Sequence, residues 1–418
     1  MREQKKQEPY SKGKKPLISL FTGAGGLDLG LEKAGFEPRI VVENDADCRA
    51  TLARNRSWNI SPIHDVSNLS GDDLLNISGL KKGEAALISG GPPCQPFSKS
   101  GYWARGDSLR LQDHRATTLS HFLRLTEASL PKAILLENVT GMGYSKKSEA
   151  ITLILESLKE INLKNRTQYA PQIFKINAAD YGVPQIRERI FIVASREGKA
   201  FSLPPPTHGS DVTSGKAPWT TAWDALGDLT VTSSDEDLTM RGKWADLLPS
   251  IPEGKNYLWH TRKGGGFPIF GYRSRYWSFL LKMHRNLPSW TIQASPGPAT
   301  GPFHWDNRRL STREMARLQC FPDEYKFEGT IRSLQRQIGN AVPAAIGELF
   351  GKAISAQLFN EPICRELSLI PEKKPTSPET YKVQRPPTRF ICDLVSPKDH
   401  PGEGKGPRGR LTGAGNER

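Results

Sequence analysis

Cysteine is scarce in this sequence of 418 residues. Its five cysteines are widely scattered, and none forms a Cys-x-x-Cys pair. A structural zinc site or a disulfide framework would need such clustering, so we expect neither, and we expect no bound metal. Scattered cysteines of this kind are typical of a reducing cytoplasm, where we place the protein.

Long hydrophobic runs are also missing. No apolar stretch approaches the ~18 to 20 residues needed to cross a bilayer, so we expect no membrane association. Residues 1–15 are basic but contain no apolar signal core. We interpret them as a disordered arm and not as a secretion signal.

Acidic residues are outnumbered by basic ones. Asp and Glu total 44 against 58 Lys and Arg, which gives a net charge of +14. This excess favours a polyanionic partner, because Lys and Arg neutralise phosphates and release counterions. Ribosomal and membrane-surface proteins are also basic, so charge alone leaves nucleic acid as one alternative among several.

Short apolar runs alternate with helical stretches in the first half of the chain. The runs that we interpret as buried strands are 16–21, 39–42, 85–89 and 132–136. Their alternation with helices predicts an α/β fold, a doubly wound and mostly parallel sheet, over 16–199. The chemistry of such a sheet collects at the carboxyl ends of its strands.

The alternation ends after about residue 195. Residues 200–310 are rich in Pro, Gly, Trp and basic residues without a clear period, which predicts a second, smaller irregular domain. Helical patterning resumes within 311–358. Residues 359–418 are rich in Pro, Lys and Gly, which predicts a largely disordered tail.

A glycine-rich turn, Thr22-Gly23-Ala24-Gly25-Gly26, follows the first predicted strand, and Glu43 follows the second. Glycines let a backbone approach a ligand closely, and a carboxylate can hold both hydroxyls of a ribose. The phosphate-binding spacings GxGxxG and GxxxxGK are absent from this turn. A nucleoside cofactor without a pyrophosphate is therefore favoured, and S-adenosylmethionine fits; the alternative is a tight turn without a ligand.

Cys94 stands just beyond the third predicted strand, in the run Gly91-Pro-Pro-Cys-Gln-Pro-Phe-Ser98. Prolines on both sides restrict the backbone, which suits a side chain that faces a ligand better than one packed in a core. Most cysteines are structural, and that reading is the alternative. A thiolate here could attack C6 of cytosine, which turns the ring into an enamine and makes C5 nucleophilic.

Charged residues also mark two later strands. Glu137 ends the fourth predicted strand, where a carboxylic acid could contact N3 and the amino group of cytosine. Arg187 and Arg189 alternate along another strand, so they share one face and could grip a phosphate or the base carbonyl. The alternatives are a helix-capping glutamate and an exposed basic strand face.

These motifs together resemble those of DNA cytosine-5 methyltransferases. They stand in the family's order: Phe21-Thr-Gly-Ala-Gly-Gly26, Pro93-Cys94-Gln95, Glu137-Asn138-Val139, Gln185-x-Arg187-x-Arg189, Arg309 to Glu314 running on to Pro322, and Gln337 to Pro343. Six motifs in order over residues 16 to 357 make coincidence negligible. The resemblance is to bacterial type II restriction–modification methylases.

The resemblance implies a catalytic and S-adenosylmethionine-binding domain over 16–199, a target-recognition domain over 200–310 and a conserved segment, 311–358, that returns to the first. Cys94, Glu137 and Arg189 would be catalytic, with support from Arg187. Asn44 departs from the pattern of relatives that carry a stacking aromatic residue there. The implied cofactor-binding residues are Phe21, Gly23, Gly25, Glu43, Asn44, Asp65, Val66, Pro93 and Asn340.

The implied partner is double-stranded DNA, from which the target cytosine is flipped out. We expect a monomeric, nucleoid-associated bacterial enzyme whose functional partner is a cognate restriction endonuclease. Expected DNA contacts are Ser98, Ser100, Arg115, Arg241, Arg262, Arg273 and Arg275. A tRNA cytosine-5 methyltransferase shares most of these motifs and is the rival enzyme. A catalytically dead DNA-binding regulator is the other rival, but Cys94 and Glu137 are both present.

Overall fold

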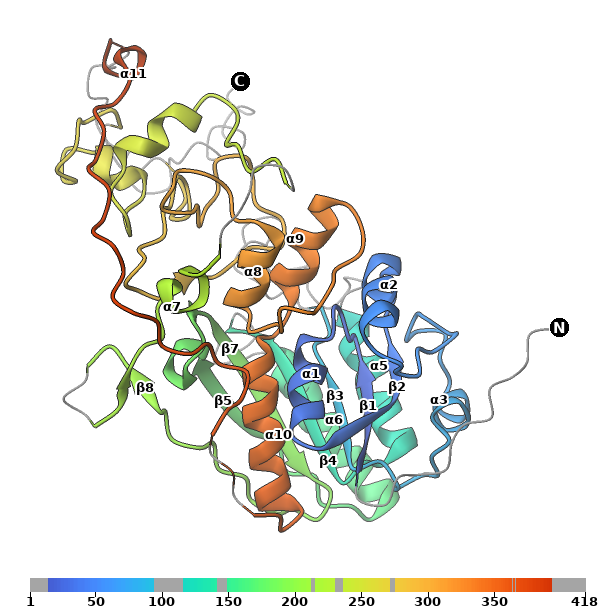
Figure 1. Ribbon diagram of the computed structural model, residues 1–418. Coiled ribbons are helices and arrows are strands. Elements are labelled where there is room, and N and C mark those ends of the chain that lie inside the picture. The colour runs from blue at the N-terminus through green and yellow to red at the C-terminus, as the bar shows by residue number, and fades with distance from the viewer. Residues whose placement is uncertain are drawn as a thin grey trace, which may run out of the picture.

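The computed structural model of the protein describes residues 14–93, 116–140, 149–211, 215–229, 236–270, 275–362, 364 and 366–392. Figure 1 shows a body of sheet and helices with a more irregular body beside it. Among the helices of these described ranges, none is long and apolar enough to cross a membrane.

A six-stranded mixed sheet forms the centre of the larger body. In spatial order its strands are β2 (Phe36–Val42), β1 (Lys15–Leu20), β3 (Leu87–Gly90), β4 (Ala133–Val139), β7 (Glu188–Ser195) and β5 (Gln172–Asn177). Strands β1 to β4 are parallel, whereas β7 is antiparallel to both of its neighbours. The predicted α/β fold with a mostly parallel sheet is confirmed.

Helices cover both faces of this sheet, because alternate strand residues point to opposite sides. The first core joins Leu17, Leu87, Leu135 and Val193 to residues of α1 (Gly26–Lys33) and α10 (Ala344–Leu358). The second core joins Ile18, Ile88, Ile134 and Ile192 to residues of α3 (Gly71–Ser78), α5 (Ala116–Ser129) and α6 (Glu149–Asn165). The strands are therefore apolar on both faces, as buried parallel strands are.

Helices α1 and α10 lie in close contact in front of the sheet (Figure 1). A Cβ atom built on Gly30 would lie 2.1 Å from the carbonyl oxygen of Ala344, and one on Gly347 would lie 2.3 Å from that of Leu27. Only glycine fits at either position. The first and last helices of the larger body thus pack backbone against backbone.

The remaining elements lie outside the sheet and the helices that cover its two faces. Helix α2 (Ala46–Asn55) begins at Asp45, whose side chain accepts hydrogen bonds from two backbone N–H groups of the first turn. Helix α8 (Thr312–Leu318) begins with a capping box formed by Ser311 and Glu314. The others are η4 (Ala178–Tyr181), β6 (Gln185–Ile186), β8 (His208–Gly209), β9 (Ala217–Pro218), α7 (Ala222–Leu226), β10 (Ser289–Trp290) and α9 (Ile331–Asn340).

An aromatic cluster, the third core, stabilises the smaller body. Tyr257, Phe270 and Phe279 pack edge to face, with ring centroids 5.3 to 6.2 Å apart. Two short 3-10 helices, η6 (Ala245–Ser250) and η7 (Tyr257–His260), contribute residues to it. Its position agrees with the irregular domain expected within 200–310, although the boundaries of that domain stay a prediction.

Residues 366–392, which we call the strap, run from α10 along the outside of the molecule to the smaller body (Figure 1). The strap ends in helix α11 (Thr388–Cys392), and Phe390 is buried in the third core. The largely disordered tail expected over 359–418 stays a prediction, and the strap is the part of it that the structure describes. A few side chains anchor an otherwise extended chain, and composition alone does not reveal such anchors.

Candidate active site

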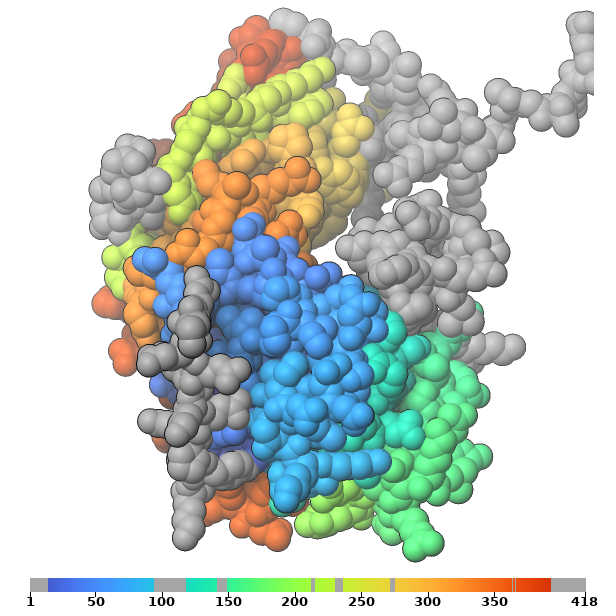
Figure 2. All heavy atoms as spheres, turned by 90° about the vertical axis from the view of Figure 1, so that its right-hand side faces the viewer, coloured from blue at the N-terminus to red at the C-terminus, as the bar shows by residue number. Residues whose placement is uncertain are grey.

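A cavity of about 610 Å³ opens where β1, β2, β3 and β4 end, and we call it the strand-end cavity. Its volume suits a nucleoside-sized ligand. Residues of α9 close one side, and in Figure 2 the orange residues near 330 lie directly above the blue N-terminal part of the chain. Its lining includes Phe21, Gly23, Glu43, Asn44, Asp65, Val66, Pro93, Glu137, Asn138, Arg189, Arg336 and Asn340.

The glycine turn wraps around the carboxylate of Glu43. The backbone N–H of Gly23 donates to Glu43 Oε2 (2.6 Å), and that of Asp45 donates to Oε1 (2.7 Å). Burial raises the pKa of Glu43, and these two N–H donors oppose the rise. Phe21, Gly23 and Gly25 have positive φ angles of 55°, 57° and 81°, so the turn bends tightly around the carboxylate.

Helix α9 contributes Arg336 and Asn340, which lie one turn apart and therefore share a face. Arg336 forms an ion pair with Asp45 (2.6 Å), and Gln337 accepts a hydrogen bond from Thr51 of α2 (2.7 Å). These contacts hold α9 against the start of α2. Sequence reasoning found Asn340 but missed Arg336, although the spacing of four residues would have pointed to it.

Two further predicted cofactor residues, Asp65 and Val66, line the same cavity. Asp65 accepts a hydrogen bond from the backbone of Ser67 (2.8 Å), and Arg124 donates to the carbonyl oxygen of Val66 (2.8 Å). Asn44 is held by its backbone, because Arg49 donates to its carbonyl oxygen (2.7 Å). The segment between β2 and α3 is thus fixed at the rim.

Asp28, in the first turn of α1, is a cavity residue that the sequence analysis did not single out. It is fully buried, and its Oδ1 has no hydrogen-bond partner. Burial raises the pKa of Asp28 to about 7, although a hydrogen bond from Ser19 lowers it. An unsatisfied acidic oxygen beside the cavity fits a cationic ligand.

Glu137 and Arg189 face each other across β4 and β7. Val139 is paired with Arg189 in the antiparallel register, and Arg189 Nε lies 2.9 Å from Glu137 Oε1. The two side chains are only 12% and 17% exposed. Burial raises the pKa of Glu137, while the positive charges of Arg189 and Arg187 oppose the rise. In this pair, the raised pKa favours a protonated Glu137 carboxyl group, and the Arg189 guanidinium lies at a fixed position beside it.

The chain that leads to Cys94 runs beside this carboxyl group. A Cβ atom on Gly91 would lie 3.0 Å from Glu137 Oε2, and Asn138 Nδ2 donates to the carbonyl oxygen of Pro92 (3.3 Å). The ends of β3 and β4 are therefore joined at the cavity. Cys94 itself lies outside the described residues.

Arg187 lies behind the cavity and not in it. Its side chain is 1% exposed and donates to the carbonyl oxygens of Gly339 (2.8 Å) and Ala341 (2.9 Å). Burial lowers its pKa. Although the sequence places Arg187 and Arg189 on one strand face, only Arg189 lines the cavity, and Arg187 supports the turn that carries Asn340.

The expected DNA contacts fall into two groups. Ser98, Ser100, Arg115 and Arg273 lie outside the described residues. Arg241, Arg262 and Arg275 are exposed on the smaller body. Arg241 forms an ion pair with Asp237, and Arg275 lies 5.8 Å from the ring centroid of Phe279. All three side chains therefore lie at the surface of the smaller body.

Comparisons with known proteins agree on one family. A family model described as C-5 cytosine-specific DNA methylase matches residues 16–356. The chain is 38% identical over 371 residues to the type II methyltransferase M.SacI of Streptomyces achromogenes, covering 82% of this chain and 93% of the relative. It is 35% identical over 337 residues to the type II methyltransferase M.NgoFVII of Neisseria gonorrhoeae, covering 80% and 84%. Among solved structures, an E. coli prophage protein described as a candidate DNA modification methyltransferase has a TM-score of 0.59 at 24% identity, covering 83% of this chain and 100% of that chain.

Proposed function

This chain belongs to the C-5 cytosine-specific DNA methylase family, and from that membership we propose that it transfers a methyl group from S-adenosylmethionine to C5 of a cytosine flipped out of duplex DNA. The biological role would be the modification activity of a bacterial restriction–modification system, with a cognate endonuclease as functional partner. The acceptor would be a specific duplex site in the bacterial nucleoid, and the enzyme would act as a monomer.

One observation carries this proposal: a single cavity joins the glycine turn and Glu43 to the Glu137–Arg189 pair. A cofactor held at the first group and a base held at the second would share this space. The chain that leads to Cys94 passes the same point. Cofactor, base and nucleophile would then meet at one sheet edge, as the chemistry requires.

The cofactor would occupy the side of the cavity formed by the glycine turn, β2 and α9. Glu43 would face the ribose hydroxyls, and the rim formed by Asp65 and Val66 would face the adenine. When bound, the cofactor supplies a methyl group on a positively charged sulfur. The full set of residues proposed to hold it is Phe21, Gly23, Gly25, Glu43, Asn44, Asp65, Val66, Pro93 and Asn340.

The base would be held by Glu137 and attacked by Cys94. The Cys94 thiolate forms a bond to C6, and the displaced electron pair moves through C5 toward N3, where the proton held by Glu137 stabilises it. C5 would then take the methyl group, which leaves S-adenosylhomocysteine as the neutral thioether. Loss of the C5 proton to solvent and breakage of the bond between sulfur and C6 would restore the aromatic ring and the free thiolate, and N3 would return its proton to Glu137. Arg189 keeps Glu137 in position throughout.

The smaller body would read the DNA sequence. A stacked cytosine hides its reacting face, and unstacking it costs only a few kcal/mol. We propose that residues 200–310 bind the flanking bases and phosphates through Arg241, Arg262, Arg273 and Arg275, while Ser98, Ser100 and Arg115 contact the backbone near Cys94.

Bisulfite sequencing tests the reaction and the acceptor together. DNA and tRNA would be sequenced from cells that express the wild-type chain and from cells that express Cys94→Ser. We expect cytosines that resist bisulfite conversion at one DNA sequence motif, and only in the cells that express the wild-type chain. Resistant positions in tRNA and none in DNA would replace the proposal with the rival tRNA enzyme.

A further inference from the structure

The strap follows the last helix of the larger body and lies beyond the matched residues 16–356. Its start is fixed to that body. The backbone N–H of Ser368 donates to Glu348 of α10 (2.9 Å), and Lys374 donates to the carbonyl oxygen of Asp224 (2.6 Å) and forms an ion pair with Asp228 (3.2 Å). Because Ala222, Ala225 and Leu226 of α7 pack in the first core, the first third of the strap belongs to the larger body.

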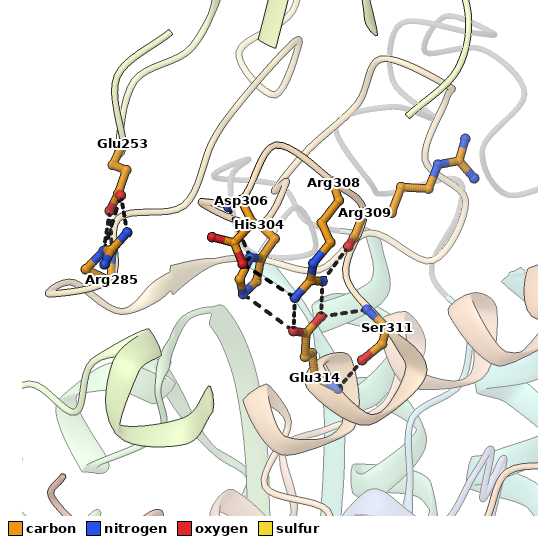
Figure 3. A network of polar contacts seen from close by, with 8 residues as sticks. All are labelled: Glu253, Arg285, His304, Asp306, Arg308, Arg309, Ser311 and Glu314. Atoms are coloured by element: carbon orange, nitrogen blue, oxygen red, sulfur yellow. Dashed lines mark hydrogen bonds and ion pairs between the residues drawn. The ribbon is translucent and has the colours of Figure 1, made fainter. Parts of the chain in front are cut away.

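The middle of the strap passes a buried ion pair. Arg285 and Glu253 lie 2.7 Å apart and are almost completely buried (Figure 3). The Arg285 guanidinium also donates to the carbonyl oxygen of Pro378 (3.4 Å) and lies 5.0 Å from the ring centroid of Tyr381. The strap thus covers an ion pair that would otherwise face solvent from this side.

The end of the strap is inserted into the smaller body. Phe390 is buried in the third core and stacks on Trp244, with ring centroids 5.6 Å apart and an interplanar angle of 13°. Arg389 forms an ion pair with Asp246, and the N–H of Gln384 donates to the carbonyl oxygen of Pro249 (3.2 Å). One continuous segment is therefore anchored in both bodies.

Polar contacts also hold the segment that leads from the smaller body into α8. The N–H of Phe303 donates to the carbonyl oxygen of Leu281, and the N–H of Met283 donates to that of Phe303, both at 2.8 Å. Arg308 donates two hydrogen bonds to Glu314 of α8 (2.7 and 2.8 Å; Figure 3). Relative motion is the default for two bodies of one chain, so each further anchor between them restricts it.

The middle of the strap lies beside the segment that leads into α8. Tyr381 to Gln384 line a cavity of about 380 Å³ together with Trp305, Asp306 and Asn307. A segment that is anchored in both bodies restricts their relative rotation. Because its start is already fixed, Phe390 meets Trp244 as an intramolecular partner at high effective concentration.

We propose that the strap fixes the angle between the third core and the sheet body, and that Tyr381 and Phe390 are positioning residues for DNA binding. The consequence for DNA rests on the proposed function. A fixed angle presents the recognition surface and the strand-end cavity to one duplex at the same time. If the anchor were released, part of the free energy of duplex binding would be used to order the two bodies, and the affinity for the duplex would fall.

The test compares the full-length wild-type chain with Phe390→Ala and Tyr381→Ala. Glu379→Ala, an exposed residue of the same strap, is the matched control. Small-angle X-ray scattering measures the radius of gyration, and titrations measure the affinities for S-adenosylmethionine and for a cognate duplex. Each anchor variant should have a larger radius of gyration and about tenfold weaker duplex binding, while cofactor affinity and the control stay within twofold of wild type.

Two results would overturn the proposal. One is an unchanged radius of gyration and duplex affinity in both anchor variants. The other is an equal loss of cofactor and duplex affinity, which would mean general destabilisation and no effect on position. A wild-type chain that binds neither ligand would overturn the proposed function, while the scattering comparison would still decide whether the strap fixes the angle.

Discussion

The sheet body and the third core, two regions of one chain, differ in what holds their functional side chains. In the sheet body, Glu43 and Glu137 stand at strand ends, and backbone pairing fixes their spacing. In the third core, packed aromatic rings fix the loops, and Arg241 and Arg262 project from the surface. The first arrangement keeps distances constant, as bond-making requires, and the second lets the exposed residues vary without disturbing the core.

The largest expected effect is a complete loss of methyl transfer in a variant that still folds. Cys94→Ser should abolish methyl transfer but leave the affinity for S-adenosylmethionine close to wild type, because the hydroxyl is a far weaker nucleophile than the thiolate. Incorporation of labelled methyl groups measures the first quantity and calorimetry the second.

Wild-type protein should also form a covalent adduct with DNA that carries 5-fluorocytosine, since that base is unable to lose its C5 substituent. The serine variant serves as the control and should form none. Substantial activity in the variant would remove Cys94 from the mechanism.

The next effect concerns the buried pair Glu137–Arg189. Glu137→Gln keeps the shape of the side chain but removes its charge and its proton. Turnover should fall by ~10² to 10⁴, the usual contribution of a positioned acid. Single-turnover rates at saturating DNA and cofactor measure the change. A loss smaller than about tenfold would leave Glu137 as a structural residue only.

Smaller losses of duplex affinity are expected when the exposed arginines of the smaller body are replaced. Arg241→Ala, Arg262→Ala and Arg275→Ala should each weaken duplex binding. Loss of a phosphate contact should weaken binding to all sequences and reduce the salt slope by about one, whereas loss of a base contact should cost about 1 to 3 kcal/mol at one position. Affinity against salt on cognate and single-mismatch duplexes separates the two. If none of the three changes either quantity, DNA recognition lies elsewhere.

The smallest effect concerns Asp28, whose pKa is raised to about 7. An unfolded aspartate releases its proton near pH 4, so this carboxyl supports folding fully below that pH and loses its contribution as pH rises through 7. Asp28→Asn should therefore gain stability relative to wild type between pH 5 and pH 8, by a few degrees in Tm (roughly 2 to 4 °C per kcal/mol). Asp72→Asn, an exposed residue of α3, should show no such trend. A constant difference between Asp28→Asn and wild type would contradict the assigned pKa.

Much of the sheet body could be predicted from the sequence, for a physical reason. Apolar runs such as 85–89 are the signature of strands buried on both faces, and strand ends collect the residues that do chemistry. The expected cofactor residues Glu43 and Asn340 line one cavity although they are far apart in the chain. Arg187 shows the limit, because it lies between β6 and β7 and not within one strand, so strand alternation does not place its side chain.

The sequences of the smaller body and the strap contain no periodic apolar pattern of this kind. Trp244 and Phe390 meet in one core, but aromatic residues in an aperiodic segment carry no sign of their partners. Asp28 was missed for a related reason, since helix spacing alone does not reveal that its carboxyl group is buried beside the cavity. Such contacts depend on how distant segments are placed, and only the structure gives that.

The glycine contact between α1 and α10 sets the order in which the protein can mature on the ribosome. The two helices are separated by the synthesis of all residues from Lys33 to Ala344, which takes roughly 15 to 60 s at ~5 to 20 residues per second. During that interval the face of the nascent sheet that carries α1 still lacks α10, so its exposed apolar surface is a natural target for chaperones. The strand-end cavity also awaits α9, which is made just before α10. We therefore expect a growing chain to be unable to methylate DNA, so that protection of the genome begins only with released, full-length molecules.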